Sequence, residues 1–455
     1  MLEEYYLKLP AYIQTALVSV SGLMLRATRS SGAYGPARQN ILQRNIWRKN
    51  QFEAFALSQF SDLVGFAVEN VDFYRRNRDK YLRPQFTPAD IARIPVLKKE
   101  LIRNAPSAFI AERIPPGWQK VKTTGTTGTP LAVESDNLSR QLNYAYFDNF
   151  LEAHCGVSPF AKHCVLGGRL VCSRTQQRPP FWRYSLAQHS LLMSSYHLSD
   201  VHIPHYLDAI RKYSPAYIEG YPSALEAIAR FALRVDKPLN VPVLITSAET
   251  LDSAQRALIE QGFRGKVFDQ YGCAEMSVFA AQCEHGTYHI RQDYGYVEVV
   301  DEHENLVGDG EVGELVCTGF LNRRMPLIRY RIGDRGAVSN KVTCPCGLDT
   351  SVLLKLEGRR DDVVVCADGA RVGRLSPVLK GFPVRQAQYL QAVPGIVELL
   401  LVPDDRFIES RDLPMILHAV QLRLGFDTVI HIRLVDEIPR GPGGKFRAVV
   451  SSMQI

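Results

Sequence analysis

The sequence predicts an α/β protein with a large N-terminal domain of mixed and parallel sheets and a small α+β domain at the C-terminus. With 455 residues, the chain exceeds one ordinary hydrophobic core. In its middle, short apolar runs such as AYIEGY and PVLITSAE alternate with helical patterns such as PSALEAIARFALRV, as parallel sheets require. From about residue 287 the pattern changes to alternating strands and turns, which indicates a β-rich part.

The expected elements follow in order along the chain. Residues 1–105 form a helical leader, since FEAFALSQFSDLVGFAVENVDFYRRN carries apolar residues at three- and four-residue steps. A second helix, SRQLNYAYFDNFLEA, follows a polar loop. The β-rich part covers 287–358 and completes a large domain of residues 1–358. Residues 359–455, with strands VELLLV and HIRLVD and helix PMILHAVQLRLG, form a small mobile lid.

Composition excludes several classes of protein. A hydrophobic content of 46% and a charged content of 22% are those of a soluble globular protein. The net charge of +7 suits an anionic ligand, but the basic residues are scattered, which disfavours nucleic-acid binding. Nine cysteines, together with an acidic start (MLEEYY) where a secretory signal is basic, predict a cytoplasmic protein whose thiols are free or bound to metal.

The most apolar early run is ALVSVSGLML, residues 16–25. It is far shorter than the roughly 20 residues of a spanning helix. Core packing is therefore the preferred interpretation of residues 11–26, and a helix lying on a membrane surface is the alternative.

The stretch KTTGTTGTP, residues 122–130, suits neither a helix nor a hydrophobic strand. Its glycines open backbone conformations that other residues avoid, and its threonines add hydroxyl donors without bulk. Such a loop can close around a phosphate, and a solvated turn is the alternative. A Walker-type loop would carry lysine directly after the last glycine, whereas this chain has Thr129 there.

Two later stretches carry groups suited to a nucleotide. In FDQYGCAE, 268–275, the Tyr271 ring could stack on a base, Gly272 leaves its backbone open, and Glu275 is a hard oxygen ligand for Mg²⁺. The alternative is a strand that enters an ordinary helix N-terminus. In RYRIGDRG, 329–336, Asp334 could accept the hydroxyls of a ribose, or be an aspartate in a common turn.

The last two stretches lie at and beyond the expected domain boundary. EGRRDD, 357–362, could act as both a sugar contact and a hinge. IPRGPGGKFRAVV, 438–450, places Lys445 on a glycine-rich loop, where a compact charge could neutralise a transient anionic centre. The alternative for Lys445 is a basic, solvated tail.

Taken together and in this order, the five stretches resemble the motifs of the adenylate-forming superfamily of acyl-CoA synthetases, adenylation domains and luciferases. Within it, the chain most resembles the phenylacetate–CoA ligase family, and its leader LPAYIQTALVSVSGLMLR is similar to that of the branch associated with capsular-polysaccharide biosynthesis. SAETL, 247–251, lies where members of the superfamily usually carry a glycine–glutamate pair. Ser247 and Ala248 depart from that pattern.

The resemblance implies roles for individual residues. Thr123, Glu275 and Lys445 are expected to be catalytic, with Glu275 holding Mg²⁺, and Asp361 is expected to be the hinge on which the lid withdraws Lys445. The expected ATP contacts are Thr124, Gly125, Thr126, Thr127, Gly128, Ala248, Glu249, Thr250, Asp269, Gln270, Tyr271, Gly272, Asp334 and Arg359.

The implied reaction joins a carboxylic acid to AMP with release of pyrophosphate and then transfers the acyl group to a thiol such as CoA. Transfer to a carrier protein, an amine or a saccharide hydroxyl is one alternative. A protein that binds nucleotide without turnover is another. Apolar residues near 217–231 favour an aryl or acyl substrate, while the sequence identifies neither the acid nor the oligomeric state.

A separate cysteine–histidine pattern predicts a metal site. CEHGTYH and CPCG together supply three cysteines and a histidine, a normal tetrahedral zinc set. The resemblance implies a structural zinc and selects His289 rather than His285. Free buried thiols beside a surface histidine are the alternative. The expected ligands are Cys283, His289, Cys344 and Cys346.

Overall fold

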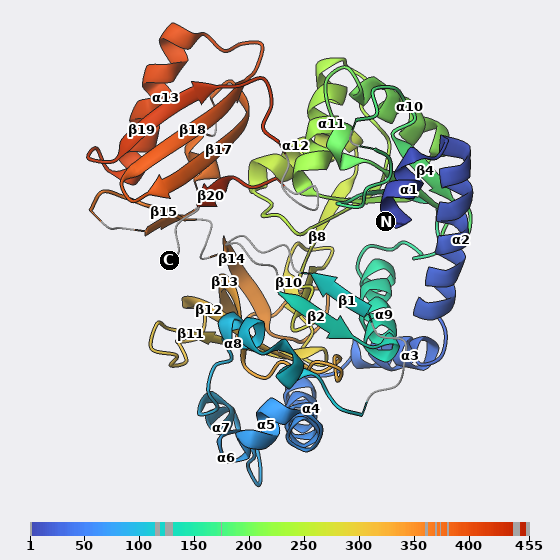
Figure 1. Cartoon of the computed structure of the whole chain (residues 1–455), viewed down its shortest axis with the longest axis vertical. Helices are drawn as coiled ribbons and strands as arrows, with labels where there is room; N and C mark the ends of the chain where they lie inside the picture. Colours follow the sequence, from blue (N-terminus) through green and yellow to red (C-terminus); the bar gives the residue numbers. More distant parts are fainter. Residues whose placement is uncertain are drawn as a thin grey trace. The chain divides into compact units, whose positions relative to one another are not determined.

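The computed structural model describes residues 2–113, 119–122, 131–173, 175–359, 363–368, 371–373, 375–379, 382–439 and 446–451. These residues divide into two compact units (Figure 1). The first extends to residue 355 without 333–336, and the second comprises 333–336 and the residues from 356 onward. The division between domains at 358/359 stays a prediction.

The first hundred residues are helical, as expected. The long helix α4 buries one face, including Phe52, Phe60 and Val64. The elements of this region are α1 (Leu2–Lys8), α2 (Ala11–Arg29), α3 (Tyr34–Arg44), α4 (Lys49–Asn70), α5 (Asp72–Arg76), α6 (Arg78–Tyr81), α7 (Pro88–Ala92), α8 (Lys99–Asn104) and the 3-10 helix η1 (Pro106–Phe109).

A twelve-stranded mixed sheet forms the centre of the first unit, with the order β11-β12-β13-β14-β10-β9-β8-β7-β6-β3-β5-β4. Strands β5, β3, β6, β7 and β8 are parallel neighbours in that order, and β9 pairs antiparallel to β8. The strands are β3 (His163–Leu166), β4 (Trp182–Ser185), β5 (Ser190–Met193), β6 (Tyr217–Gly220), β7 (Val243–Ser247), β8 (Lys266–Gly272), β9 (Phe279–Gln282), β10 (Tyr288–Ile290), β11 (Gly295–Val300), β12 (Val312–Gly319), β13 (Tyr330–Ser339) and β14 (Val352–Arg359).

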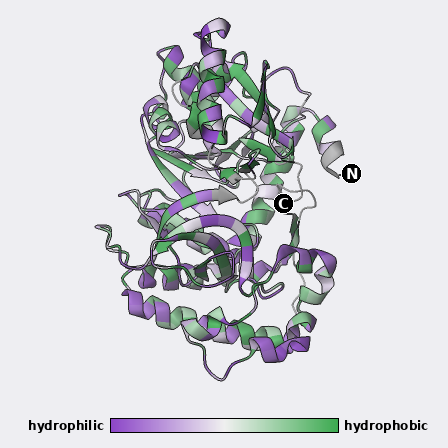
Figure 2. Ribbon diagram, turned by 90° about the vertical axis from the view of Figure 1, so that its left-hand side faces the viewer, coloured by the Kyte–Doolittle hydropathy of each residue, from purple (hydrophilic) through white to green (hydrophobic). Residues whose placement is uncertain are grey.

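Helices cover both faces of the parallel strands, so alternate side chains enter different cores. Ile218 and Leu244 pack with α10, α11 and α12, whereas Tyr217 and Ile245 pack with α3 and α9. Burial on both faces explains why these strands read as continuous apolar runs. In Figure 2 green segments are found in strands and helices alike, and the helices show purple and green turns, as expected for elements with one buried face. The connecting elements are α9 (Asn137–Ala153), η2 (Ser195–His197), α10 (Ile203–Tyr213), α11 (Pro222–Arg234) and α12 (Ser253–Phe263).

A separate two-stranded ribbon, β1 (Gln119–Lys122) and β2 (Ala132–Ser135), carries the threonine-rich stretch between its strands. The Glu134 carboxylate accepts hydrogen bonds from Arg324, whose Nη2 lies 3.2 Å away, and Asn322 Nδ2 donates to the Glu134 carbonyl at 2.9 Å. Because Glu134 is 7% exposed, this pairing is shielded from water. The ribbon is thereby fixed to the segment that precedes β13.

The second unit is built on a four-stranded sheet with the order β19-β18-β17-β20. Leu399 and Leu401 of β18 pack against Ile416 and Val420 of the helix α13, which crosses the sheet (Figure 1). Its elements are β15 (Val363–Val365), β16 (Arg371–Gly373), η3 (Ser376–Leu379), β17 (Val384–Val393), β18 (Ile396–Pro403), α13 (Glu409–Leu424), β19 (Val429–Leu434) and β20 (Val449–Ser451). The large mixed sheet with its helices, together with the separate α+β unit, confirms the predicted fold class.

Residues 11–26 of α2 pack onto the body of the first unit, with Gly22 buried against β4, but most of the apolar run 16–25 is not part of the core. Helix α2 attaches through polar groups: Gln14 Oε1 accepts from Arg183 Nε at 2.7 Å, and Ser19 Oγ donates to the Tyr184 carbonyl. Several of its apolar side chains face outward, with Leu23 60% and Met24 66% exposed. Within the described ranges, no helix combines the length and apolarity needed to cross a bilayer.

Packing between α11 and α12 gives a test of the fold. A Cβ added at Gly262 would lie 2.5 Å from the Ala229 Cβ and 2.9 Å from its carbonyl oxygen, whereas a Cβ at Gly65 of α4 meets nothing within 4 Å. Gly262→Ala should therefore destabilise the first unit by about 1–3 kcal/mol through overpacking. The control Gly65→Ala should stabilise it by about 0.5–1 kcal/mol through helix propensity. Urea unfolding followed by circular dichroism measures both, and equal effects of the two variants would contradict this packing.

Candidate nucleotide site and candidate metal centre

The carboxyl ends of β7 and β8 meet at one edge of the sheet, next to the start of β9. In-register parallel pairing places Ser247 beside Gln270. A cavity of about 240 Å³ opens at this edge. This is the crevice where open parallel sheets bind ligands. Its lining residues are Asn143, Ser247, Ala248, Gln270, Gly272, Cys273, Val278, Phe279 and Tyr294.

The turn after β7 carries three predicted ATP contacts, Ala248, Glu249 and Thr250, and only the first of them lines the cavity. Ala248 lines the cavity and has a φ of +70°, a left-handed conformation that glycine adopts at lower cost. Glu249 turns its carboxylate to the start of α11, where it accepts from the backbone N–H of Ser223 at 3.0 Å and from its hydroxyl at 3.1 Å. Thr250 is exposed. Ala248 therefore replaces the glycine of the superfamily pattern at a position where the backbone conformation favours glycine.

The end of β8 carries the expected adenine segment. Gln270 and Gly272 line the cavity, and Tyr271 is 9% exposed. Asp269 is buried, and its carboxylate accepts hydrogen bonds from the hydroxyls of Thr246, at 2.5 Å, and Tyr288. Burial raises the pKa of Asp269 to about 6, although these hydrogen bonds oppose the shift. The Asp269 side chain therefore links β8 to its neighbour β7 and, beyond β9, to β10.

Glu275 lies in a turn between two strands, which excludes the alternative of a helix N-terminus. The chain runs from β8 through Met276, with a φ of +55°, into β9. Glu275 is 6% exposed, and its Oε1 accepts from the Tyr330 hydroxyl at 2.8 Å. Burial and the Glu275 carboxylate raise the pKa of Tyr330, so this hydroxyl stays a donor. Among described residues the hydrogen bond from Tyr330 engages only Oε1 of this carboxylate.

The remaining predicted contacts are only partly described. Asp334 lies within β13 rather than in a turn, directly after Gly333, whose φ is +87°. Arg359 ends β14, and its side chain is outside the description. Other predicted residues lie outside the described residues altogether. These are Thr123, Thr124, Gly125, Thr126, Thr127, Gly128, Asp361 and Lys445.

The four predicted zinc ligands form one cluster in which all ligand atoms lie within 4.8 Å of one another. The sulfurs of Cys283 and Cys344 are 3.5 Å apart, and the Cys346 sulfur is 3.2 Å from His289 Nε2. Zinc–sulfur bonds of about 2.3 Å in a tetrahedron would separate two sulfurs by roughly 3.8 Å. The cluster therefore has the donors and nearly the dimensions that Zn²⁺ requires.

Neighbouring contacts orient the histidine of this cluster. The Thr350 hydroxyl lies 3.1 Å from His289 Nδ1, which directs Nε2 toward Cys346. Burial, with His154 and Arg291, lowers the pKa of His289 to about 4, so the ring is neutral and able to bind metal. The His285 side chain is 46% exposed and is not part of the cluster.

Sequence comparisons place the chain among known proteins. The family model of the CapK C-terminal domain matches residues 364–452. Protein CapK of Staphylococcus aureus is 26% identical over 463 residues, which cover 100% of both chains. A phenylacetate–coenzyme A ligase of Thermus thermophilus is 25% identical over 367 residues, 77% of each chain.

The chain is a homologue of CapK and of phenylacetate–CoA ligases. This CapK homologue also shares its fold with solved CoA ligases. A 2-hydroxyisobutyryl-CoA ligase in complex with an acyl-AMP superposes with a TM-score of 0.69 over 90% of this chain and 91% of that one, at 20% identity. The anthranilate–CoA ligase AuaEII with anthranoyl-AMP gives 0.51 over 72% and 64%, at 15% identity. The fold is that of adenylate-forming ligases.

Several side chains that shape these sites carried no short-range signal in the sequence. Thr246 and Tyr288 hold Asp269, and Tyr330 holds Glu275, from positions 19 to 55 residues away along the chain. Only an alignment of strands could have paired them. In this CapK homologue Asn143 of α9 also lines the cavity, and no sequence motif indicated this residue.

The bond between Glu249 and Ser223 predicts a measurable coupling. Glu249→Ala should destabilise the first unit by about 1 kcal/mol, because it removes the acceptor of both the backbone N–H and the hydroxyl of Ser223 at the start of α11. Ser223→Ala should cost less, because it removes only the hydroxyl bond and leaves the backbone N–H bonded to Glu249. The double variant should lose less than the sum of the two, since both remove one interaction. Urea unfolding measures the cycle, with Glu302→Ala, whose side chain is 86% exposed, as a neutral control. Strictly additive losses would contradict the assigned cap.

Proposed function

We propose that the protein uses ATP to adenylate a carboxylic acid, releases pyrophosphate, and transfers the acyl group to the thiol of CoA. The observation that carries the proposal is the cavity at the ends of β7 and β8. Ala248, Gln270 and Gly272, expected near adenine from two separate motifs, line this one space. Homology to phenylacetate–CoA ligases over 77% of the chain supports the same chemistry.

The roles in adenylation follow from charge. A carboxylate oxygen of the acid attacks the α-phosphorus of ATP, and the bond to the departing pyrophosphate breaks, so two anions must be brought together. Thr123 and the following threonines would donate to phosphate oxygens, and Lys445 would supply the mobile cation. Mg²⁺, held through Glu275, would neutralise phosphate charge. Tyr330 would keep the Glu275 carboxylate oriented by its hydrogen bond of 2.8 Å.

Binding of the nucleoside would be divided between the motifs. Tyr271, with its neighbours Gln270 and Gly272, would contact adenine at the cavity, while Asp334 and Arg359 would accept and donate at the ribose. Asp361 would then be the hinge that withdraws Lys445 before thioester formation. Asp269 would contribute through its backbone, because its carboxylate is satisfied by Thr246 and Tyr288.

We also propose that the cluster of Cys283, His289, Cys344 and Cys346 holds a structural Zn²⁺. Four protein ligands complete a tetrahedron, so the metal would have no open position for catalysis. The antiparallel pairing of β10 with β14 brings His289 opposite Val352, shortly after the CPCG loop. The ion would therefore join the β9–β10 connection to the β13–β14 connection.

Lys445→Ala tests the adenylation. It should reduce ATP–pyrophosphate exchange, measured over a panel of aryl and aliphatic acids, by at least about a hundredfold, because a transition-state charge contact is lost. The control Lys212→Ala removes an exposed lysine at the end of α10 and should leave exchange unchanged. Exchange at the native rate in Lys445→Ala would refute the role of Lys445. Silence of the native protein with every acid would favour nucleotide binding without turnover.

The acyl acceptor is identified by mass analysis of the products. With CoA supplied, the proposal expects an acyl-CoA, and with CoA withheld it expects an enzyme-bound acyl-AMP. An acyl-AMP that persists when CoA is present would instead direct the search to a carrier protein, an amine or a saccharide hydroxyl.

The zinc proposal predicts one ion per chain. Cys344→Ser and Cys346→Ser should each lose most of this metal and lower the unfolding midpoint, because binding energy of a structural zinc is folding energy. Plasma mass spectrometry of the dialysed protein measures the content. Cys155→Ser, which removes a buried thiol outside the cluster, should retain it. Native protein without zinc, purified in metal-replete medium, would overturn the assignment.

A further inference from the structure

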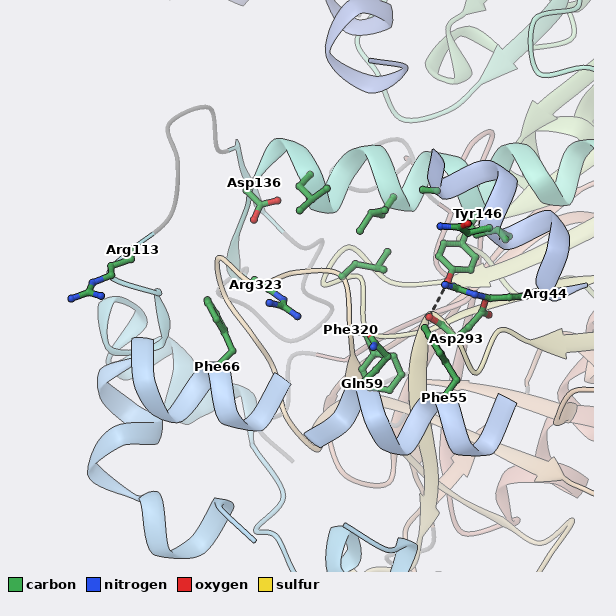
Figure 3. Close-up of a pocket in the computed structure, with 16 residues that line it drawn as sticks. Arg44, Phe55, Gln59, Phe66, Arg113, Asp136, Tyr146, Asp293, Phe320 and Arg323 are labelled. Carbon is green, nitrogen blue, oxygen red and sulfur yellow. Dashed lines mark hydrogen bonds and ion pairs between the residues drawn. The ribbon is translucent and has the colours of Figure 1, made fainter. Parts of the chain in front are cut away.

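A second cavity, of about 420 Å³, lies in the first unit between α3, α4 and α9 and the segment after β12 (Figure 3). This volume lies within the usual range of small-molecule sites. It shares no lining residue with the cavity at β7 and β8. The two cavities lie back to back: Leu142 lines one and Asn143 the other, and likewise Asp293 and Tyr294.

The interior of this second cavity is apolar. Ile41, Phe320 and Leu321 line it and are 2%, 7% and 8% exposed, so their side chains are already part of the folded core. Leu138, on the first turn of α9, is 48% exposed and marks an open side. A ligand that enters there would cover apolar surface that the protein leaves in contact with water.

The acidic side chains of the cavity are already satisfied. Arg291 donates to both oxygens of Asp293 at 2.9 Å. Burial alone would raise the pKa of the Asp293 carboxyl, but the pairing with Arg291 keeps this pKa below its ordinary value. Asp136 caps α9 by accepting from the backbone N–H of Ser139 at 2.6 Å. Of the arginines that line the cavity, Arg44 makes a longer contact with Asp293, and in the described part of the chain neither carboxylate is paired with Arg113 or Arg323.

The arginines consequently leave a surplus of positive charge. Arg44 approaches Asp293 only to 3.4 Å, and its guanidinium lies 4.3 Å above the Phe55 ring. Arg323 is exposed, and its guanidinium lies 5.3 Å from the Phe66 ring. Figure 3 shows Arg323 between α4 and α9, with Arg44 at the inner end and Arg113 at the rim. Cations held over aromatic rings beside an apolar floor suit an anion with an apolar body.

We propose that this cavity binds a small anionic amphiphile, with a phosphate or carboxylate head paired to Arg44 and Arg323 and an apolar tail against Ile41, Leu142 and Leu321. This ligand is additional to ATP, the acid and the acyl acceptor. The proposal does not depend on adenylation, because no residue of the cavity has a role in that reaction.

Isothermal titration calorimetry of the full chain tests the proposal with three eight-carbon probes below their micellar concentrations: octyl phosphate, octanoate and octan-1-ol. Saturable one-site binding is expected for at least one of the two anions and at least about tenfold weaker binding for the alcohol, since charge-assisted hydrogen bonds are lost. The tighter of the two anions identifies the head group. Equal affinity for the alcohol and both anions would overturn the proposal.

Variants locate the site. Arg323→Gln should weaken binding of the preferred anion about fivefold or more, and Leu142→Trp, which fills the cavity, should abolish it. The matched control Arg78→Gln, an exposed arginine on α6, should bind like the native chain. Because Arg44 also contacts Asp293, the exposed Arg323 is the primary test and folding of each variant is checked by circular dichroism. Native affinity in well-folded Leu142→Trp would place the probe elsewhere and refute the inference.

Discussion

The parallel pairing of β7 with β8 is the constraint on which the candidate nucleotide site depends. It sets Thr246 opposite Asp269 and Ser247 opposite Gln270, and the hydrogen bond of 2.5 Å from Thr246 to the Asp269 carboxylate fixes this register through side chains. A slip of one residue would exchange the faces of β8 and turn Gln270 away from the cavity. Burial raises the pKa of Asp269 to about 6, and its carboxylate joins β8 to β7 through Thr246 and to β10 through Tyr288.

The same logic explains which features the sequence could predict. The fold class was predictable because strand periodicity is local, and the gathering of 248 with 270 and 272 was predictable from the order of motifs that the chain shares with the superfamily it resembles. The inward turn of the Asp269 side chain was not, since its partner Tyr288 belongs to β10, 19 residues away. The outward face of α2 was also missed, because an apolar run does not say which side meets the body. There Gln14, buried at 2%, forms the contact.

The candidate metal centre was predicted from composition and resemblance, and strand order accounts for its assembly. β10 lies between β9 and β14, so the short connection that carries Cys283 and the loop that carries CPCG meet at neighbouring strands. Two thiols lie 3.5 Å apart beside a histidine held by Thr350. Burying these polar groups costs free energy unless a bound ligand satisfies them. The geometry of the cluster therefore supports the proposed zinc site.

The ribbon β1–β2 holds the two ends of the glycine- and threonine-rich stretch that we propose to contact phosphate. Its two ends are paired, Lys122 with Ala132, and its base is held by Glu134 to Arg324 across 190 residues of sequence. Fixing the ends of a loop lowers the entropy that it loses when its N–H and hydroxyl groups close on an anion. If this stretch binds phosphate as proposed, the partly buried pair of Glu134 and Arg324 would contribute to that binding, because it supports the base of the ribbon.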